Sequence, residues 1–483
     1  MAIRRTMLIF MLCALPLVGG CRQSESGPIG VSAIGGPPQL ANPNLGPLDP
    51  PSAFLALAAA QGLIRFNAQG QIEPALAQSW IVSDDGLRYT FRLVRARWPD
   101  GGPITAQQVA ARLRAAAAPA SRNPLKPVLG AIEEIVAMTD EVLEISLKSP
   151  RPNFPELLAQ PEMAVIRNGQ GSGPYRFTRQ ADGSVRLELP RPEDEEAPSL
   201  APAIILRGER AALAVARFDR QSADLVTGGT LGDLPIARAA DPPANALVFD
   251  PVAGLLGLAF TQTGGLLGDP RAREALSMAV DRGAIVQALA VPGLQPRESL
   301  LPPGIEGLPP SAPPPWAANP LPARRGIAAR AIAELAKGAP VTVRVAMPDG
   351  PGYRLLFAHL KRDWSAIGVT AERVGMNARA DLQLVDAVAP IDLASWYLRH
   401  FLCEASLVCD PAADAMLAAA RIAPNAAERR ARLADADRTL IAITPFIPIA
   451  APVRWSLVSR RLTGFRPNPR GRHPAGELIR AAP

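Results

Sequence analysis

The segment from residue 341 to residue 374 constrains the fold more than any other part of this 483-residue sequence. Val341 to Ala346 has the β-branched composition of a strand, Tyr353 to Ile367 has helical periodicity, and Val369 to Val374 is again typical of a strand. A strand, a helix and a strand in this order form the crossover unit of a parallel sheet. The segment therefore predicts an α/β fold.

The N-terminus has the pattern of an export signal. Arg4 and Arg5 precede an apolar run, Met7 to Leu17, which is too short to span a bilayer as a mature helix. Val18-Gly19-Gly20-Cys21 then resembles a bacterial lipobox, in which the cysteine is acylated. We therefore expect residues 1–20 to be a lipoprotein signal peptide and Cys21 to anchor an extracytoplasmic protein to a membrane. The alternative is an ordinary cleaved signal followed by a chance cysteine.

The length and composition of the chain indicate a tether followed by folded domains. Residues 21–45 are rich in Gly, Pro, Ser and Asn, which predicts a flexible tether with an extended lead-in segment. The mature chain is long enough for two or three domains, and hydrophobic residues, which make up 48% of the sequence, are ample for their cores. The formal charge of +7 is spread out and no basic cluster carries aromatic residues, so we expect no nucleic-acid partner.

Cys403 and Cys409 remain once Cys13 and Cys21 are assigned to the N-terminal signal. In an oxidising compartment, two cysteines this close together predict a local disulfide. The alternative is a metal pair, but only His400 lies nearby and a Cys/His zinc site needs about four ligands. We therefore expect neither a metal nor another cofactor.

Several local patterns predict where individual elements begin and end. Strands are expected at Arg88 to Leu93 and at Glu141 to Leu147, because apolar residues alternate there. Helices are expected over 53–63, from the capping box at Thr105 to about Ala117, from Asp269-Pro270, and from Asn425 to a stop at Pro445.

Four blocks stand in order along the chain. The first combines Pro74-Ala75-Leu76-Ala77-Gln78-Ser79-Trp80, Asp85-Gly86-Leu87-Arg88-Tyr89-Thr90-Phe91-Arg92-Leu93 and Trp98-Pro99-Asp100-Gly101-Gly102-Pro103-Ile104-Thr105-Ala106-Gln107-Gln108-Val109. The others are Gly171-Ser172-Gly173-Pro174-Tyr175-Arg176-Phe177, Asp269 to Arg282, and Leu355 to Val369. Together they resemble the extracytoplasmic solute-binding proteins of the oligopeptide/dipeptide/nickel-binding family (family 5) of ABC transporters. Val94 and Gln108 replace the arginine and aspartate that are usual in the first block.

The resemblance covers roughly residues 40–470 and implies an α/β, two-lobed fold of the type II periplasmic-binding-protein kind. It also implies the extra subdomain of the peptide-binding cluster and a ligand cleft between the lobes. The implied parts are lobe I (46–58, 168–250 and 452–483), its extra subdomain (59–167) and lobe II (251–451). Connections near residues 250 and 451 would form the hinge about which the lobes close.

The region that should select the ligand departs from the family pattern. In peptide-binding members, an acidic residue after a strand of the second lobe holds the peptide amino group. Here that strand is Asp381-Leu382-Gln383-Leu384 and the motif after it is rebuilt. Asp386 and Asp392 are candidates to hold an amine, with Trp396 and Tyr397 as the pocket wall, so we expect a neutral or cationic ligand. The alternative is a surface loop held by the disulfide.

The resemblance implies a monomeric receptor that captures a peptide or peptide-like solute and delivers it to an ABC permease and ATPase complex. An enzyme is not expected, because the three histidines are scattered and Gly-x-Ser-x-Gly, HExxH and phosphate-loop motifs are absent from the sequence. The alternative is an envelope lipoprotein of the same fold with a chaperone, sensor or structural role.

Overall fold

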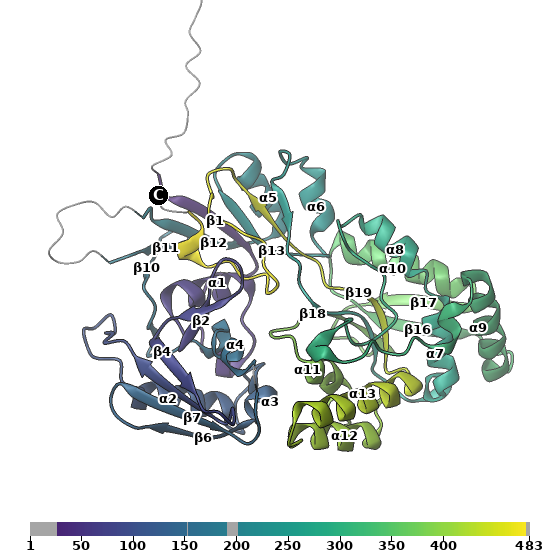
Figure 1. The fold of residues 1–483 in the computed structure, drawn as a ribbon. Helices are drawn as coiled ribbons and strands as arrows, with labels where there is room; N and C mark the ends of the chain where they lie inside the picture. Colours follow the sequence, from purple (N-terminus) through teal and green to yellow (C-terminus); the bar gives the residue numbers. More distant parts are fainter. Residues whose placement is uncertain (1–26, 152, 191–200, 480–483) are drawn as a thin grey trace, which may run out of the picture.

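The computed structural model describes residues 27–151, 153–190 and 201–479. The predicted signal peptide and Cys21 lie outside these ranges. Three main sheets organise the described chain, and Figure 1 shows them in two bodies that lie side by side. One body holds a seven-stranded sheet with a four-stranded sheet beneath it, and the other holds a five-stranded sheet. No helix within the described ranges has both the length and the apolar character needed to cross a membrane.

The seven-stranded sheet forms the centre of the first lobe. Its spatial order is β10 (Arg176–Arg179), β11 (Val185–Glu188), β12 (Ile204–Glu209), β1 (Ile29–Ile34), β13 (Leu225–Thr230), β20 (Arg454–Val458) and β14 (Leu247–Phe249). The prediction that residues 21–45 are tether and lead-in is therefore wrong for 29–34. β1 pairs in parallel with both β12 and β13, and Ile29, Val31 and Ala33 are buried, because their alternating side chains face the core of the lobe.

Helices α1 (Pro50–Ala59), α5 (Ala211–Asp219) and α6 (Leu234–Ala239) complete this lobe. The predicted helix over 53–63 begins earlier, at Pro50, because the Asp49 side chain caps it by accepting a hydrogen bond from the Ser52 amide. Its C-terminal end lies against the Gly-Ser-Gly block. The Gly173 amide donates to the Ala59 carbonyl, and a Cβ on Gly171 would lie 1.9 Å from the same oxygen. Glycine thus allows the close approach that precedes β10.

The four-stranded sheet belongs to the subdomain. Its order is β4 (Ala77–Val82), β5 (Arg88–Leu93), β7 (Val142–Leu147) and β6 (Ile132–Ala137), and α2 (Ala106–Ala117) packs on it. Tyr89 and Phe91 are buried as their alternation predicts. The capping box is also present, since Thr105 accepts from the Gln108 amide and Gln108 reaches back to the Thr105 amide. Gln108 additionally accepts a 2.8 Å hydrogen bond from the indole of buried Trp98.

Smaller elements lie in the subdomain or next to it. They are the hairpins β2 (Ile64–Phe66) with β3 (Ile72–Pro74) and β8 (Ile166–Arg167) with β9 (Gln170–Gly171), and the short helices α3 (Lys126–Leu129) and α4 (Phe154–Leu158).

The five-stranded sheet organises the second lobe, in the order β17 (Val369–Val374), β16 (Val341–Ala346), β18 (Leu382–Val388), β15 (Gly254–Phe260) and β19 (Phe446–Ala450). β16 and β17 are parallel and joined by α10 (Pro351–Ser365), which confirms the predicted crossover unit. Six further helices surround the sheet: α7 (Pro270–Ala279), α8 (Arg282–Leu289), α9 (Leu321–Ala336), α11 (Ala394–Leu398), α12 (Pro411–Arg421) and α13 (Ala426–Ile443). Asp269 caps α7 and Asn425 caps α13, as predicted.

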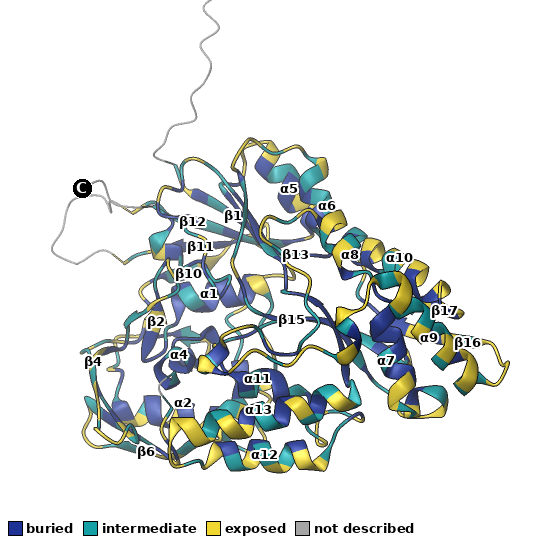
Figure 2. Ribbon diagram, turned by 45° about the vertical axis from the view of Figure 1, so that its right-hand side comes forward, coloured by how far each residue is buried: buried dark blue, intermediate teal, exposed yellow. Residues whose placement is uncertain are grey.

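The chain passes from the first lobe to the second between Phe249 and Gly254, and returns between Ala450 and Arg454. One buried cluster runs across these crossings, since it joins Val226 of β13 to Leu258 of β15. Figure 2 shows that buried residues follow the strands and the inner faces of the helices in both bodies. The predicted domain boundaries otherwise stay a prediction.

Candidate functional site

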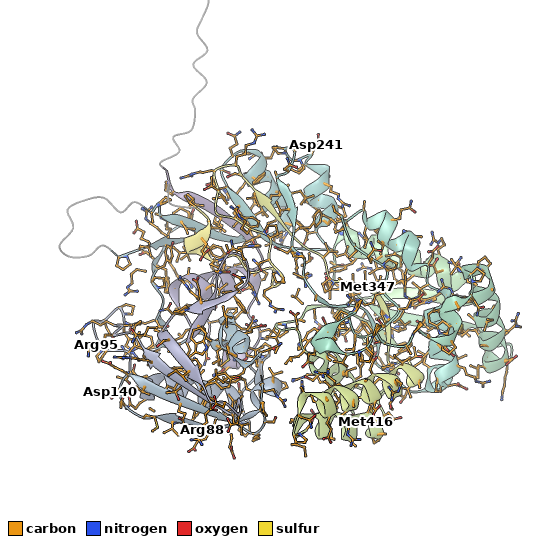
Figure 3. The ribbon with its side chains drawn as sticks, viewed as in Figure 1. Arg88, Arg95, Asp140, Asp241, Met347 and Met416 are labelled. Atoms are coloured by element: carbon orange, nitrogen blue, oxygen red, sulfur yellow. A yellow bond between two sulfur atoms is a disulfide. The ribbon has the colours of Figure 1, made fainter. Side chains whose placement is uncertain are left out.

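A cavity of about 740 Å³ lies between the subdomain and the second lobe. This size suits a small solute, since ligand pockets commonly measure about 300–1,000 Å³. We call it the cleft cavity. Its subdomain wall comes from α3, α4 and residues near them, and its second-lobe wall comes from α11, α12 and the chain between them. In Figure 3, Arg88 of the subdomain and Met416 of α12 lie on either side of the region where these two parts meet.

Hydrogen bonds hold the two walls together at one end of the cavity. The hydroxyl of Ser149 and Nη2 of Arg151 both donate to the carbonyl of Arg421, at 2.6 and 3.0 Å. Ser149 and Arg151 belong to the subdomain, whereas Arg421 ends α12. The cleft is therefore closed by direct contacts in this structure.

Positive charge predominates in the lining. Five cations, Lys126, Arg151, Arg399, Arg421 and Arg429, face two carboxylates, Glu306 and Glu404. One of these carboxylates is already paired within the protein, because Arg429 Nη2 lies 3.1 Å from Glu306 Oε1 and both side chains are largely buried. The cleft cavity thus carries an excess of positive charge.

Two of these arginines have pKa values lowered to about 10. Burial is the main cause for Arg151, and the nearby charge of Arg429 adds to it. Burial is also the main cause for Arg399, and Arg421 contributes next. Both guanidinium groups remain charged at neutral pH, in surroundings where positive charges repel one another.

Trp396 and His400 form an uncharged part of the wall. Their rings meet edge to face with centroids 4.6 Å apart, and His400 Nδ1 lies 2.7 Å from the Trp396 carbonyl oxygen. Burial lowers the pKa of His400. The imidazole therefore adds no charge to the cavity at neutral pH.

The structure places Asp386 outside the lining of the cleft cavity. Asp386 lies on β18, and its carboxylate accepts hydrogen bonds from Arg454 Nη1 at 2.7 Å and from the Tyr353 hydroxyl at 2.8 Å. Arg454 belongs to β20 of the first lobe, so the pair joins the lobes at the hinge. Both carboxylate oxygens accept hydrogen bonds and the side chain is only 8% exposed, so Asp386 forms a structural ion pair with Arg454.

Asp392 is likewise paired. Both of its oxygens lie 3.1 Å from the guanidinium of Arg470, which also reaches Glu156 of α4 at 3.1 Å. Arg470 thereby connects the C-terminal segment, the subdomain and the second lobe. Because Asp386 and Asp392 are both neutralised by arginine, the reason for expecting a neutral or cationic ligand no longer holds.

The two aromatic candidates, Trp396 and Tyr397, lie in different surroundings. Trp396 lines the cleft cavity, and its role in a ligand-binding wall stays a prediction. Tyr397 points into the core of the second lobe and is fully buried. Burial raises the pKa of Tyr397 to about 12, and its hydroxyl has no hydrogen-bond partner among the described residues.

A disulfide joins Cys403 to Cys409, with Cα atoms 5.1 Å apart. It closes the loop that follows Arg399 and His400, and the Cys403 amide donates to the Asp414 carboxylate of α12. The described residues contain no group of three or more histidine, cysteine, aspartate or glutamate side chains arranged to hold a metal ion.

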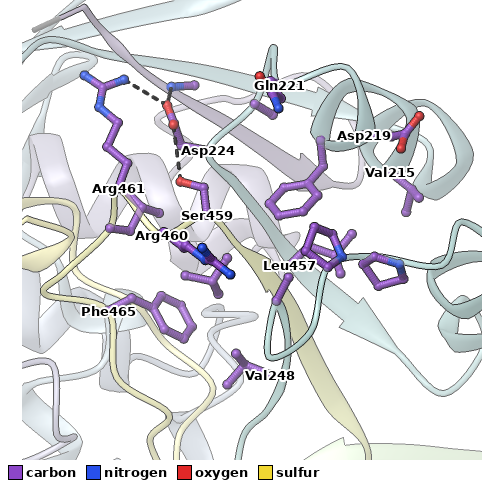
Figure 4. Close-up of a pocket in the computed structure, with 18 of the residues that line it drawn as sticks. Val215, Asp219, Gln221, Asp224, Val248, Leu457, Ser459, Arg460, Arg461 and Phe465 are labelled. Atoms are coloured by element: carbon purple, nitrogen blue, oxygen red, sulfur yellow. Dashed lines mark hydrogen bonds and ion pairs between the residues drawn. The ribbon is translucent and has the colours of Figure 1, made fainter. Parts of the chain in front are cut away.

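A larger cavity, of about 1,100 Å³, lies at the outer end of the first lobe. Figure 4 shows its apolar floor of Val248, Leu457 and Phe465, with Asp224 bonded to Ser459 and Arg461 at one side. All of its lining comes from the first lobe. Movement of one lobe against the other therefore cannot close it round a ligand, and the cleft cavity is the better candidate.

Sequence reasoning missed the arginines of the cleft cavity. Arg151 stands far from Arg399, Arg421 and Arg429 in the chain, and their spacing forms no motif. Arginine carries nearly all the positive charge of this sequence, so no single arginine stood out. Only the folded arrangement brings these four together.

The profile described as bacterial extracellular solute-binding proteins, family 5, middle region, matches residues 71–399. The chain belongs to this family. It is accordingly a binding protein and not an enzyme, and the family to which it belongs is extracellular.

Curated relatives match shorter stretches. The chain is 25% identical over 282 residues to the oligopeptide-binding protein OppA of Bacillus subtilis (strain 168), covering 51% of this chain and 52% of that protein. It is 28% identical over 163 residues to the nickel-binding periplasmic protein of Escherichia coli (strain K12), covering 33% of this chain and 29% of that protein. The first relatives are thus matched over about a quarter to a half of their length.

Solved structures match almost the whole chain. Haemophilus influenzae OppA, in complex with the peptide RPPGFSPFR, superposes with a TM-score of 0.79 at 18% identity, covering 94% of this chain and 98% of that one. The Escherichia coli murein tripeptide binding protein MppA gives 0.80 at 19% identity, covering 92% and 97%. These likenesses establish the two-lobed binding-protein fold, as predicted.

Proposed function

We propose that this protein is an extracytoplasmic solute-binding lipoprotein that captures a peptide or peptide-like solute and delivers it to an ABC permease and ATPase complex. The cleft cavity is the observation that carries this proposal, because its two walls belong to different parts of the molecule. Relatives of the family include proteins named for binding oligopeptides and glutathione, which supports a peptide-like cargo.

Capture would proceed by hinge closure. A ligand shifts the balance between open and closed forms only if it binds one form better than the other. A ligand in the cleft cavity meets both walls only when they are together, so it favours the closed form. The two crossings, at 249–254 and 450–454, are the natural hinge segments.

The test is to screen the purified protein against peptides, opines, sugars and metal chelates. A true ligand should raise the melting temperature and compact the molecule in solution scattering. At about 100 times the dissociation constant, the added stability should reach about 2.7 kcal/mol. If no member of these libraries produces either change, the transport proposal is wrong.

The membrane anchor is a separate part of the proposal. It is motivated by the short apolar run and by Gly19-Gly20 before Cys21. Mass spectrometry of the protein from membranes should find lipid on Cys21, and Cys21→Ser should yield a soluble or unprocessed form. Wild-type protein without lipid would rule out the anchor and leave ligand capture unaffected.

One observation favours the alternative of an envelope lipoprotein without a transport role. The second-lobe loop that follows β18 packs Ile391 and Leu393 into the core of the subdomain, and Gln160 donates to the Pro390 carbonyl at 2.5 Å. The chain thus supplies its own contacts across the cleft. A molecule that stays equally compact with and without every solute tested would support this alternative.

A further inference from the structure

We infer that the cleft cavity selects anionic solutes, and that Arg399 is the principal residue that binds their acidic group. This inference rests on the proposed function and names the class of solute: an acidic peptide or peptide-like molecule that carries a carboxylate in addition to its termini.

Arg421 is exposed to solvent, so Arg399 is the cation of the cavity that is both withdrawn from solvent and without a partner among the described residues. Arg429 is paired with Glu306, and Arg151 donates to two backbone carbonyls, those of Pro150 and Arg421. By contrast, no hydrogen bond or ion pair satisfies Arg399 within the described residues, and its Nε is buried. The residue as a whole is half-buried, and a buried guanidinium nitrogen without an acceptor is uncommon, because losing water without gaining an acceptor is costly.

The surroundings of Arg399 increase this need for an anion. The positive charge of Arg421 disfavours the charged form of Arg399. The charges of Arg429 and Arg421 likewise disfavour the charged form of Arg151. The negative charge of Glu404, an exposed residue, partly counteracts this repulsion, but Glu404 and Arg399 form no ion pair. A bound anion would relieve repulsion among charges from both walls, and so would favour closure.

The chemistry of the site matches a carboxylate. A planar guanidinium donates two parallel hydrogen bonds to a carboxylate, which gives both strength and orientation. The lining also includes the apolar side chains Phe154, Leu157, Trp396 and Leu417, which can contact the body of the solute. A phosphate group would satisfy the same donors, so the experiment includes both.

The experiment compares three peptides that differ at one side chain: Ala-Glu-Ala, Ala-Gln-Ala and Ala-Lys-Ala. Isothermal titration of the full mature protein should give about tenfold or tighter binding for Ala-Glu-Ala than for Ala-Gln-Ala, because hydrogen bonds to charged groups are the strong ones. C-terminally amidated peptides separate the side-chain carboxylate from the terminal one. Glutarate and inorganic phosphate serve as probes that lack a peptide backbone.

Variants assign the effect to the cleft. Arg399→Met should weaken binding of Ala-Glu-Ala much more than binding of Ala-Gln-Ala and so remove the preference, and Arg399→Lys should keep part of the preference. Arg330→Met is the matched control, since Arg330 is an exposed arginine on α9 outside the cavity lining. The control should bind all three peptides like the wild type.

The possible results separate this inference from the proposed function. Equal affinities for the acidic and neutral peptides, or a preference unchanged by Arg399→Met, would overturn the inference while the receptor proposal stands. The inference also fails if Ala-Lys-Ala binds best. If phosphate alone binds and no carboxylate does, the carboxylate assignment is wrong. Failure of every solute to bind would overturn both proposals.

Discussion

Replacing Asp386 by alanine should destabilise the protein strongly, and without any role for ligand. The carboxylate bonds to Arg454 of the first lobe and to the Tyr353 hydroxyl, and the side chains of Asp386 and Arg454 are only 8% and 20% exposed. Alanine leaves a largely buried guanidinium without its counter-charge, with only the backbone carbonyls of residues 453 and 386 as acceptors, and it takes the carboxylate acceptor from a buried phenol. Removing one partner of such a pair costs about 3–5 kcal/mol.

Asp392→Ala is the matched comparison. Its side chain is 55% exposed, and Arg470 keeps Glu156 as a partner after the change. The Arg470 side chain is only 6% exposed, but because Glu156 still neutralises it no charge is left without a partner, and the loss should be smaller than for Asp386→Ala.

Urea unfolding of the ligand-free proteins, followed by circular dichroism, would measure both losses. Asp386→Asn keeps an acceptor for Tyr353 and should lie between the wild type and Asp386→Ala. A double-mutant cycle with Arg454→Ala would isolate the ion pair. If Asp386→Ala unfolds like the wild type but loses affinity for solute, Asp386 faces the ligand and this reasoning is wrong.

Three smaller changes test other parts of the structure. Replacing Cys403 and Cys409 by serine should lower stability by about 2 kcal/mol through the freed loop, and two free thiols in the denatured wild type would contradict the disulfide. Because burial lowers the pKa of His400, the unfolded chain binds its proton more readily, so stability should fall as the pH drops below about 6.5. Unfolding at about pH 7 and about pH 5 should show a smaller fall in stability for His400→Gln than for the wild type. Thr105→Ala should cost about 1 kcal/mol in thermal or urea unfolding, and no loss would mean that the capping box does not stabilise α2.

Elements whose signals are local could be predicted from the sequence. The crossover unit of β16, α10 and β17, the buried alternation of β5 and the capping box of α2 all depend on residues within a few positions of one another. The order of the four blocks was enough to indicate the family and, through it, the two-lobed fold. The strand β1 was missed because its short alternating pattern lies within a Gly- and Pro-rich stretch, and only its neighbours β12 and β13 bury it.

The sequence alone thus determined the fold class, the family and the disulfide-forming pair, whereas the tertiary structure decided which charges are available to a ligand. Asp386 and Asp392 appeared free in the sequence, but the arginines that neutralise them lie 68 and 78 residues further along the chain. Arg399 appeared ordinary, yet folding places it opposite Arg151 of another part of the molecule and provides it with no acceptor within the described residues. The physical reason is that the state of a charged side chain depends on its burial and on its neighbours in space, and packing between distant segments sets both.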